Sequence, residues 1–159
     1  MTQKAFQDYY PDEFSHCYGC GRLNEKGLQI KSYWEGEEAV ARFLPGDHHT
    51  ATPGFVYGGM IASLIDCHST GTASAAAYRK EGRTMDTDPL RFVTAALKVD
   101  YLAPTPLGVE LELRSKVMEI KEKKVVIETR VLADNKTCAT GNVVAVRMPE
   151  TMMTKTTQR

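Results

Sequence analysis

Hydrophobic and polar positions divide the chain into one helical segment and several alternating segments on both sides of it. Across residues 58–78 apolar side chains recur every three or four positions, the spacing of one face of an α-helix. The remaining positions are mostly small, and the segment contains no Lys, Arg or Glu. A helix without a charged face is normally buried all round, so we expect the rest of the chain to wrap around it. Arg79 and Lys80 in the last turn, followed by Gly82, mark its C-terminal end.

The segments flanking this helix alternate with a period of two, which is typical of β-strands. Residues 28–34 and 39–44 surround a turn at 35–37 and predict a hairpin. Four further strands are predicted after the helix, at residues 92–102, 109–120, 124–133 and 137–148, and the last three should form an antiparallel meander. Strands grouped around one helix predict an α+β fold. We therefore expect the hotdog fold, an antiparallel sheet of five to six strands around one long central helix.

Composition limits the classes of protein and partner. At 159 residues with 42% hydrophobic content, the chain suits one domain over residues 1–159, with 1–15 as a variable N-terminal segment and 149–159 as a flexible tail. The 20 basic and 20 acidic residues cancel, which removes the bulk electrostatic argument for nucleic acid or an anionic membrane as partner. No segment has the apolar length of a signal peptide or a membrane span. We expect a cytoplasmic protein.

Four cysteines are present, and a chain of this length without a secretion signal is not expected to use them as a disulfide framework. Cys17 and Cys20 have the spacing of a zinc-binding pair, but structural zinc takes four ligands and no second pair at ligand spacing follows. We therefore favour a tight loop with small buried thiols, and no metal.

Asp66 is the one acidic residue of the predicted helix. A buried carboxylate is costly unless a partner or a reaction uses it, and an ionised carboxylate acts as a base or nucleophile. The alternative is a structural carboxylate paired with a basic group or a backbone amide. Gly58 and Gly59 begin the helix without a capping side chain before them, so their N–H groups could stabilise a carbonyl oxygen that gains negative charge. Glycines chosen only for packing would look the same.

The distance along the helix between the Gly58–Gly59 amides and Asp66 limits how the two groups could act on one substrate. Seven residues from Gly59 to Asp66 correspond to about 10 Å along the axis. One helix can hardly present both groups to a single carbonyl, so if both are catalytic, one comes from a second subunit. This predicts a homodimer with sites at its interface. A thioester suits such a site, because a thiolate leaves readily without a strong acid.

Three blocks of sequence carry a resemblance to a known family. They are Cys-Tyr-Gly-Cys-Gly at residues 17–21 continuing to 28, the segment from His49 through Pro-Gly-Phe-Val-Tyr-Gly-Gly at 53–59 to Asp66, and Thr-Ala-Ala-Leu at 94–97 continuing to Pro104. In these blocks the chain resembles the hotdog-fold acyl-CoA thioesterases of the PaaI-like type. The middle block is the most specific.

The resemblance implies roles for individual residues. Asp66 matches the catalytic carboxylate, as nucleophile or general base, and the backbones of Gly58 and Gly59 match the groups that polarise the thioester carbonyl. Thr94 matches a hydroxyl residue that orients water or the carboxylate, and His49 falls where many relatives have histidine. Without the family, Thr94 would be a strand residue chosen for β-propensity and His49 a solvated loop residue.

The implied activity is hydrolysis of an acyl-CoA to a carboxylic acid and free CoA, without bound cofactor or metal, by a homodimer in which further pairing to a tetramer stays open. Tyr57 stands where relatives commonly have histidine before the two glycines, which puts any role of that histidine in doubt. Arg79, Lys80 and Arg83 could bind the CoA phosphates or could simply complement the helix dipole. The alternatives are an enoyl-CoA hydratase or dehydratase using His49 with Asp66, and a non-catalytic acyl-CoA-binding module. The acyl group stays open.

Overall fold

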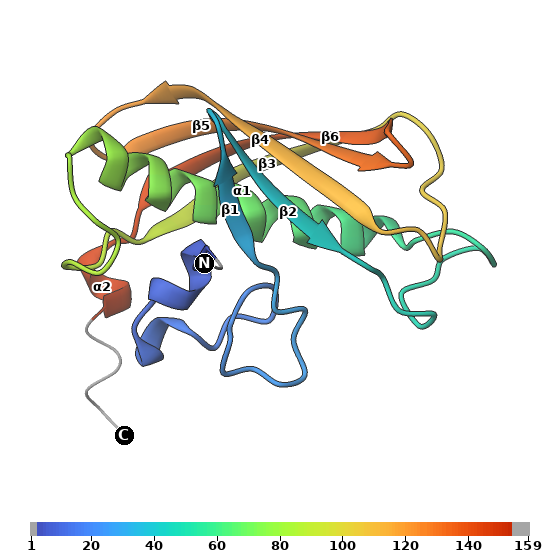
Figure 1. Cartoon of the computed structure of the whole chain (residues 1–159), viewed down its shortest axis with the longest axis horizontal. Coiled ribbons are helices and arrows are strands. Elements are labelled where there is room, and N and C mark those ends of the chain that lie inside the picture. The colour runs from blue at the N-terminus through green and yellow to red at the C-terminus, as the bar shows by residue number, and fades with distance from the viewer. Residues whose placement is uncertain (1–2, 154–159) are drawn as a thin grey trace.

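One antiparallel sheet of six strands covers a single long helix, and the computed structural model describes this arrangement for residues 3–153 (Figure 1). The strands follow the order β1-β2-β4-β5-β6-β3 across the sheet. This confirms the predicted hotdog arrangement. The elements are the 3-10 helices η1 (Phe6–Tyr9) and η2 (Asp12–Phe14), the strands β1 (Ser32–Glu35), β2 (Glu38–Phe43), β3 (Phe92–Tyr101), β4 (Leu111–Ile120), β5 (Lys124–Ala133) and β6 (Lys136–Arg147), and the helices α1 (Gly58–Lys80) and α2 (Glu150–Met153).

Helix α1 begins at the predicted residue and ends at Lys80, within the predicted last turn. Glu81 is the C-cap, and Gly82 follows with a φ of 65°, in the left-handed region. The Arg83 N–H donates to Tyr78 O at 2.9 Å, and the Gly82 N–H donates to Arg79 O at 3.1 Å. These two bonds form a Schellman motif, which confirms Gly82 as the residue that ends the helix.

The core lies between α1 and the concave face of the sheet, where helix and strand side chains interdigitate. From residue 67 to 78 every position of α1 is buried, as expected for a helix without a charged face. The first third of α1 differs, because five positions there are only half-buried: Gly58, Gly59, Ala62, Ser63 and Asp66. The expectation of burial all round therefore holds for the C-terminal part of α1 and is wrong for one face of its beginning.

Two consecutive residues of α1 make buried polar contacts. His68 Nε2 donates to Ala39 O at 3.1 Å, and its Nδ1 accepts from Ser32 Oγ at 2.8 Å. The Ser69 hydroxyl shares a hydrogen bond of 2.8 Å with Thr129 Oγ1 of β5. His68 and Ser69 thus connect α1 to β1, to β2 and to the centre of the sheet.

The first hairpin is shorter than the sequence predicts. Strand β1 begins at Ser32, and residues 28–31 instead lie along the cysteine loop, with the Leu28 N–H donating to Tyr18 O at 2.8 Å and the Ile30 N–H to Gly19 O at 3.1 Å. Gln29 between them has a φ of 51°. A non-glycine residue in that region breaks the strand, which is why the alternating pattern overestimates β1.

Described residues near both ends of the chain take part in the fold. Phe6 and Tyr10 of the N-terminal segment are buried in the core, and Gln7 Nε2 donates to Ser32 Oγ at 3.0 Å. Residues 150–153 of the expected tail form α2, and residues 154–159 lie outside the described residues. Within residues 3–153 no helix is long and apolar enough to cross a membrane.

Candidate active site

Asp66 and Thr94 meet between α1 and β3, although 28 residues separate them. The Thr94 hydroxyl donates a hydrogen bond to Asp66 Oδ1. Within residues 3–153 the carboxylate has no ion-pair partner, and Oδ2 accepts no hydrogen bond from the protein. A structural carboxylate would be expected to have such a partner. The arrangement instead holds one oxygen in place and leaves the other available to a water molecule or a substrate.

The start of α1 presents backbone N–H groups. Tyr57 is the N-cap and makes no side-chain capping bond, and the first turn contains no acidic residue. The first intrahelical bond runs from the Met60 N–H to Tyr57 O at 3.0 Å. The amides of Gly58 and Gly59 precede that bond, so they are the ones available to an anionic or polarised ligand.

Two tyrosines surround these amides. The Tyr57 ring folds over Gly59, where an added Cβ would lie 2.4 Å from the ring, and the Tyr101 hydroxyl donates to Gly58 O at 2.7 Å. Tyr57 is 57% exposed and Tyr101 53% exposed. Burial of its hydroxyl, with the nearby Tyr57, raises the pKa of Tyr101. Phe55 and Leu102 extend this surface into an apolar pocket of about 310 Å³ next to Gly58.

His49 belongs to the helix start and not to the Asp66–Thr94 pair. Its backbone oxygen accepts from the Tyr57 N–H at 2.9 Å, and its Nδ1 accepts from the Gly46 N–H at 2.9 Å. The proton therefore resides on Nε2 when the ring is neutral. Partial burial, with the neighbouring His48 ring 4.0 Å away, lowers the pKa of His49. Among the described residues no hydrogen bond joins His49 to Asp66.

The three basic residues at the other end of α1 have partners within their own chain. Arg79 lies over the Trp34 ring at 3.7 Å, and Lys80 Nζ donates to Ile120 O at 3.2 Å. Arg83 Nη1 forms an ion pair with Glu81 at 2.9 Å. Twenty-one residues from Gly58 to Arg79 correspond to about 32 Å along the helix. A role of these side chains in CoA binding stays a prediction.

Asp66 and the amides of Gly59 do not meet within one chain. Helix α1 is continuous between them, so the offset of about 10 Å along the axis remains. They do share a face, because Gly59, Ala62, Ser63 and Asp66 are spaced by three or four residues and all are half-buried. A site that uses both groups therefore needs a second copy of α1.

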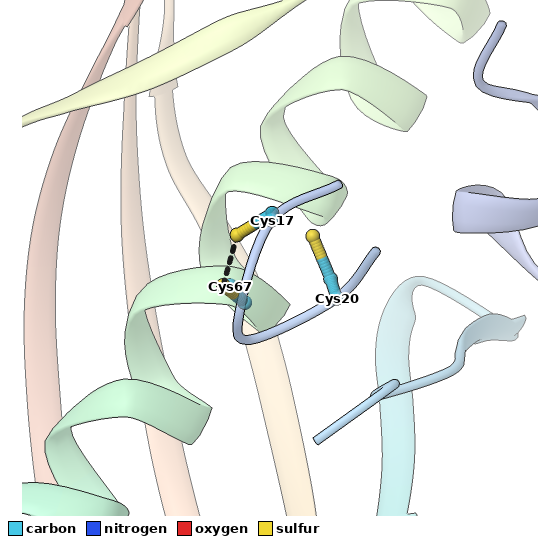
Figure 2. A group of neighbouring side chains, drawn as sticks. All are labelled: Cys17, Cys20 and Cys67. Atoms are coloured by element: carbon cyan, nitrogen blue, oxygen red, sulfur yellow. Dashed lines mark hydrogen bonds between the residues drawn. The ribbon is translucent and has the colours of Figure 1, made fainter. Parts of the chain in front are cut away.

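The structure also assembles a group that the sequence reading missed. Cys67, the neighbour of Asp66 on α1, lies beside Cys17 and Cys20 of the N-terminal loop, and the three sulfur atoms are all within 4.8 Å of one another (Figure 2). The sequence contained no local signal for the third cysteine, because only the fold brings residue 67 next to the loop.

Comparison with known proteins identifies the family. The sequence profile described as "Thioesterase superfamily" matches residues 53–140, more than half of the chain and including both glycines, Asp66 and Thr94. The chain belongs to the thioesterase superfamily. A crystal structure of a thioesterase superfamily protein from Shewanella loihica PV-4 is 52% identical, covers 88% of this chain and 100% of its own, and has a TM-score of 0.67.

More distant relatives of this thioesterase superfamily member carry functional names. Acyl-coenzyme A thioesterase THEM4 of Xenopus laevis is 38% identical over 86 residues, which are 54% of this chain and 33% of that protein. The THEM4 protein of Rattus norvegicus is 34% identical over 102 residues, 64% of this chain and 39% of that protein. The chain thus spans between a third and two fifths of the length of these curated relatives.

Two solved structures show the fold at lower identity. The PaaI protein of the E. coli phenylacetic acid degradation operon is 18% identical with a TM-score of 0.62, over 77% of this chain and 81% of that one. A Streptococcus mutans UA159 protein bound to acetyl-CoA is 18% identical with a TM-score of 0.62, over 80% and 96% of the two chains. At such identities the likeness shows the PaaI-like hotdog fold alone.

Proposed function

We propose that this protein is an acyl-CoA thioesterase in which Asp66 attacks the thioester or activates water. The observation that carries this proposal is the Asp66–Thr94 pair, a carboxylate held by one hydroxyl on an open helix face without a cation beside it. Membership of the thioesterase superfamily and the name of the THEM4 relatives support the reaction class. The Streptococcus mutans protein with bound acetyl-CoA supports CoA as part of the substrate.

A second copy of the chain completes the proposed site. If Gly59 faces the partner subunit's Asp66 across a two-fold axis, the axis passes between Ala62 and Ser63, midway along the half-buried face of α1. Both residues are small, so two α1 helices can approach closely there. The resulting homodimer has two equivalent sites, each with a carboxylate from one chain and helix amides from the other.

Strand β3 supports the same pairing. It is an edge of the sheet, and its residues 94–98 are exposed in the isolated chain. An exposed edge strand that carries Ala95, Ala96 and Leu97 is a template for pairing with another chain. A partner that covers β3 would also enclose Thr94, and with it the Asp66 carboxylate.

The chemistry follows from these positions. In the general-base route, Asp66 Oδ2 takes a proton from water, the new hydroxide oxygen bonds to the thioester carbon, and the carbonyl oxygen becomes an oxyanion. The amides of Gly58 and Gly59 in the partner stabilise that oxyanion. Collapse breaks the C–S bond, and the CoA thiolate takes from Asp66 the proton that came from water. The products are a carboxylic acid and free CoA.

In the nucleophilic route, Asp66 itself bonds to the carbonyl carbon and expels the thiolate, which leaves a mixed anhydride that water then hydrolyses. The geometry is compatible with both routes, because Oδ2 is the free oxygen in each. Incorporation of labelled oxygen from water into Asp66 during single turnover distinguishes them.

Substitution of Asp66 tests the proposal directly. Asp66→Asn keeps the shape and removes the base, so acyl-CoA hydrolysis measured by release of free thiol should fall by about 100-fold or more. Asp134→Asn makes the same chemical change in the exposed β5–β6 turn and should leave the rate unchanged. Unfolding curves of both variants show whether the fold is retained.

The outcome also separates the alternatives. Full hydrolysis by a folded Asp66→Asn variant contradicts the assignment of Asp66. A wild-type protein that binds acyl-CoA and releases no thiol favours the binding module, and turnover of an enoyl-CoA without thiol release favours the hydratase or dehydratase. A panel of acyl-CoA substrates of different chain length and aromatic character defines the acyl group.

A further inference from the structure

The three clustered cysteines have the geometry of a thiolate metal site. Their sulfur atoms all lie within 4.8 Å of one another, and Cys17 Sγ is 3.6 Å from Cys67 Sγ. Tetrahedral zinc with Zn–S bonds of about 2.3 Å places its sulfur ligands about 3.8 Å apart. Cys20 and Cys67 are buried and Cys17 is half-buried. The observed spacing therefore needs only a small contraction to surround one ion.

The loop that carries Cys17 and Cys20 is shaped around Cys67 (Figure 2). Gly19 passes so close to the helix that an added Cβ would lie 2.2 Å from Cys67 Sγ, so only glycine fits there. The Gly21 N–H donates to Cys17 O at 2.7 Å and closes the turn between the two loop cysteines. The backbone bonds from Leu28 and Ile30 to this loop hold it against α1.

Arg91 supplies an independent indication of negative charge at this place. Its guanidinium lies against Cys20 and over the Tyr10 ring at 4.2 Å, and its Nε and Nη1 are buried without a hydrogen-bond partner among residues 3–153. Buried guanidinium nitrogens without acceptors are costly unless an anion lies nearby. Three thiolates around one divalent cation carry a net charge of about −1, which Arg91 would balance.

We propose that Cys17, Cys20 and Cys67 bind one Zn²⁺ ion, with water or another exchangeable ligand in the fourth position. The choice of metal follows from the soft, buried, all-sulfur ligand set. Binding displaces the protons of those thiols that are still protonated. The ion would fasten the N-terminal loop to α1 at the residue next to Asp66, and this proposal does not depend on the reaction proposed above.

The test is the zinc content of the full-length protein, purified without chelator and under reducing conditions. We expect one zinc per chain in the wild type, and loss of it to background in Cys17→Ser and in Cys20→Ser. Cys138→Ser is the matched control, because Cys138 is a buried cysteine of β6 that contacts Lys136 O and lies outside the cluster. It should retain one zinc per chain.

Thermal unfolding provides a second readout. A strong chelator should lower the Tm of the wild type and of Cys138→Ser, whereas the Tm of Cys17→Ser should not respond, because a ligand stabilises only the state that binds it. Replacement of zinc by Co²⁺ should give thiolate-to-cobalt charge-transfer bands that are absent in Cys17→Ser.

Three results would overturn the proposal. The first is a reduced wild-type protein that contains no zinc and takes up none when Zn²⁺ is added. The second is equal zinc loss in Cys138→Ser, which indicates non-specific binding. The third is a wild-type protein whose cluster cysteines resist thiol reagents until a reductant is added, which indicates a disulfide instead of a metal site.

Discussion

The Thr94 hydroxyl determines how the Asp66 carboxylate is presented. It donates to Oδ1 from the edge strand β3, and Oδ2 accepts no hydrogen bond among residues 3–153. The proposed reaction uses Oδ2, and the hydrogen bond to Oδ1 orients it. Thr94 is therefore a positioning residue whose effect should appear in kcat.

Substitutions at Thr94 separate the hydroxyl from the shape of the side chain. Thr94→Val removes the bond to Asp66, and a hydrogen bond to a charged group contributes about 1.5–3 kcal/mol, so kcat should fall by about 10-fold or more. Thr94→Ser keeps the hydroxyl and should stay within about threefold of wild type. Steady-state thioesterase assays measure both. Equal activity of Val and Ser variants would contradict the role of the hydroxyl.

His68 makes stability depend on pH. Burial lowers its pKa from 6.5 to about 4 in the folded chain, while the hydrogen bond to Ala39 opposes this shift. Between these values the unfolded chain binds more protons, so stability is full above pH 6.5 and falls as the pH drops toward 4. From pH 7.5 to 5 the loss due to His68 should be about 2 kcal/mol in urea unfolding.

Variants isolate this contribution from that of other groups. His68→Gln should flatten the dependence of unfolding free energy on pH in that window, and His16→Gln, at an exposed histidine, should leave it unchanged. Parallel curves for wild type and His68→Gln would show that His68 is not the titrating group.

Some site residues could be identified from the sequence and others could not. Asp66 stands out because it is the one carboxylate of a helix whose other charged residues, Arg79 and Lys80, lie in its last turn, and this is a local property. Thr94 looks like any other strand residue in the local sequence pattern, and only the family resemblance indicated that it belongs to the site. Cys67 and Arg91 belong to no motif with Cys17 and Cys20, because the contacts among them arise from packing of the cysteine loop, helix α1 and the residue that precedes β3.

At the scale of elements, the two ends of α1 and the first hairpin show what local signals can do. Gly82 marks the end of the helix because its φ of 65° is one that glycine adopts readily, so the residue's own backbone preference decides that terminus. The start of β1 was predicted four residues too early, because alternation continues through Gln29 while its backbone leaves the strand region. The start of β1 is decided by the hydrogen bonds between residues 28–31 and the cysteine loop. The sequence pattern of residues 28–31 gives no sign of these bonds.

The Schellman motif gives a prediction for the helix end. Gly82→Ala forces an L-residue into a φ of 65° and should lower the free energy of unfolding by about 1 kcal/mol. Gly82→Asn should cost less, because asparagine tolerates this region better than alanine. Urea unfolding measures both, and an alanine variant as stable as the wild type would contradict the assignment.

At the scale of the molecule, one chain contains the parts of the proposed site but does not bring them together. The face of α1 formed by Gly59, Ala62, Ser63 and Asp66 is half-buried, and the neighbouring part of β3 is exposed. The sequence predicted a homodimer from the axial offset alone. The structure adds the face on which a partner would pack.

Mixed dimers test whether sites combine two chains. Gly58→Pro removes one candidate oxyanion donor at the first helical position, where proline is tolerated, and the ψ of 131° at Tyr57 suits a following proline. Gly58→Pro and Asp66→Asn homodimers should each lose about 100-fold or more in kcat. Co-expressed mixed dimers should recover about half of the wild-type activity per dimer, because one of their two sites keeps both intact groups.

If each site belonged to a single chain, mixing two inactive variants would restore nothing. Tandem affinity tags isolate the mixed species, and light scattering confirms its mass. A mixed dimer as inactive as its parents therefore rejects the shared site while leaving the zinc proposal untouched.

The hydrogen bonds of the adjacent residues His68 and Ser69 affect how α1 is oriented about its own axis. Aliphatic packing alone would let a rod rotate or slide by small amounts at little cost. Here consecutive residues reach different neighbours, Ala39 and Ser32 on one side and Thr129 on the other, and any rotation breaks one of these bonds in a dry interior. These bonds fix the rotation of α1 about its own axis. They therefore also fix the direction in which Asp66, two residues before His68, projects from the helix, although none of them contacts its carboxylate.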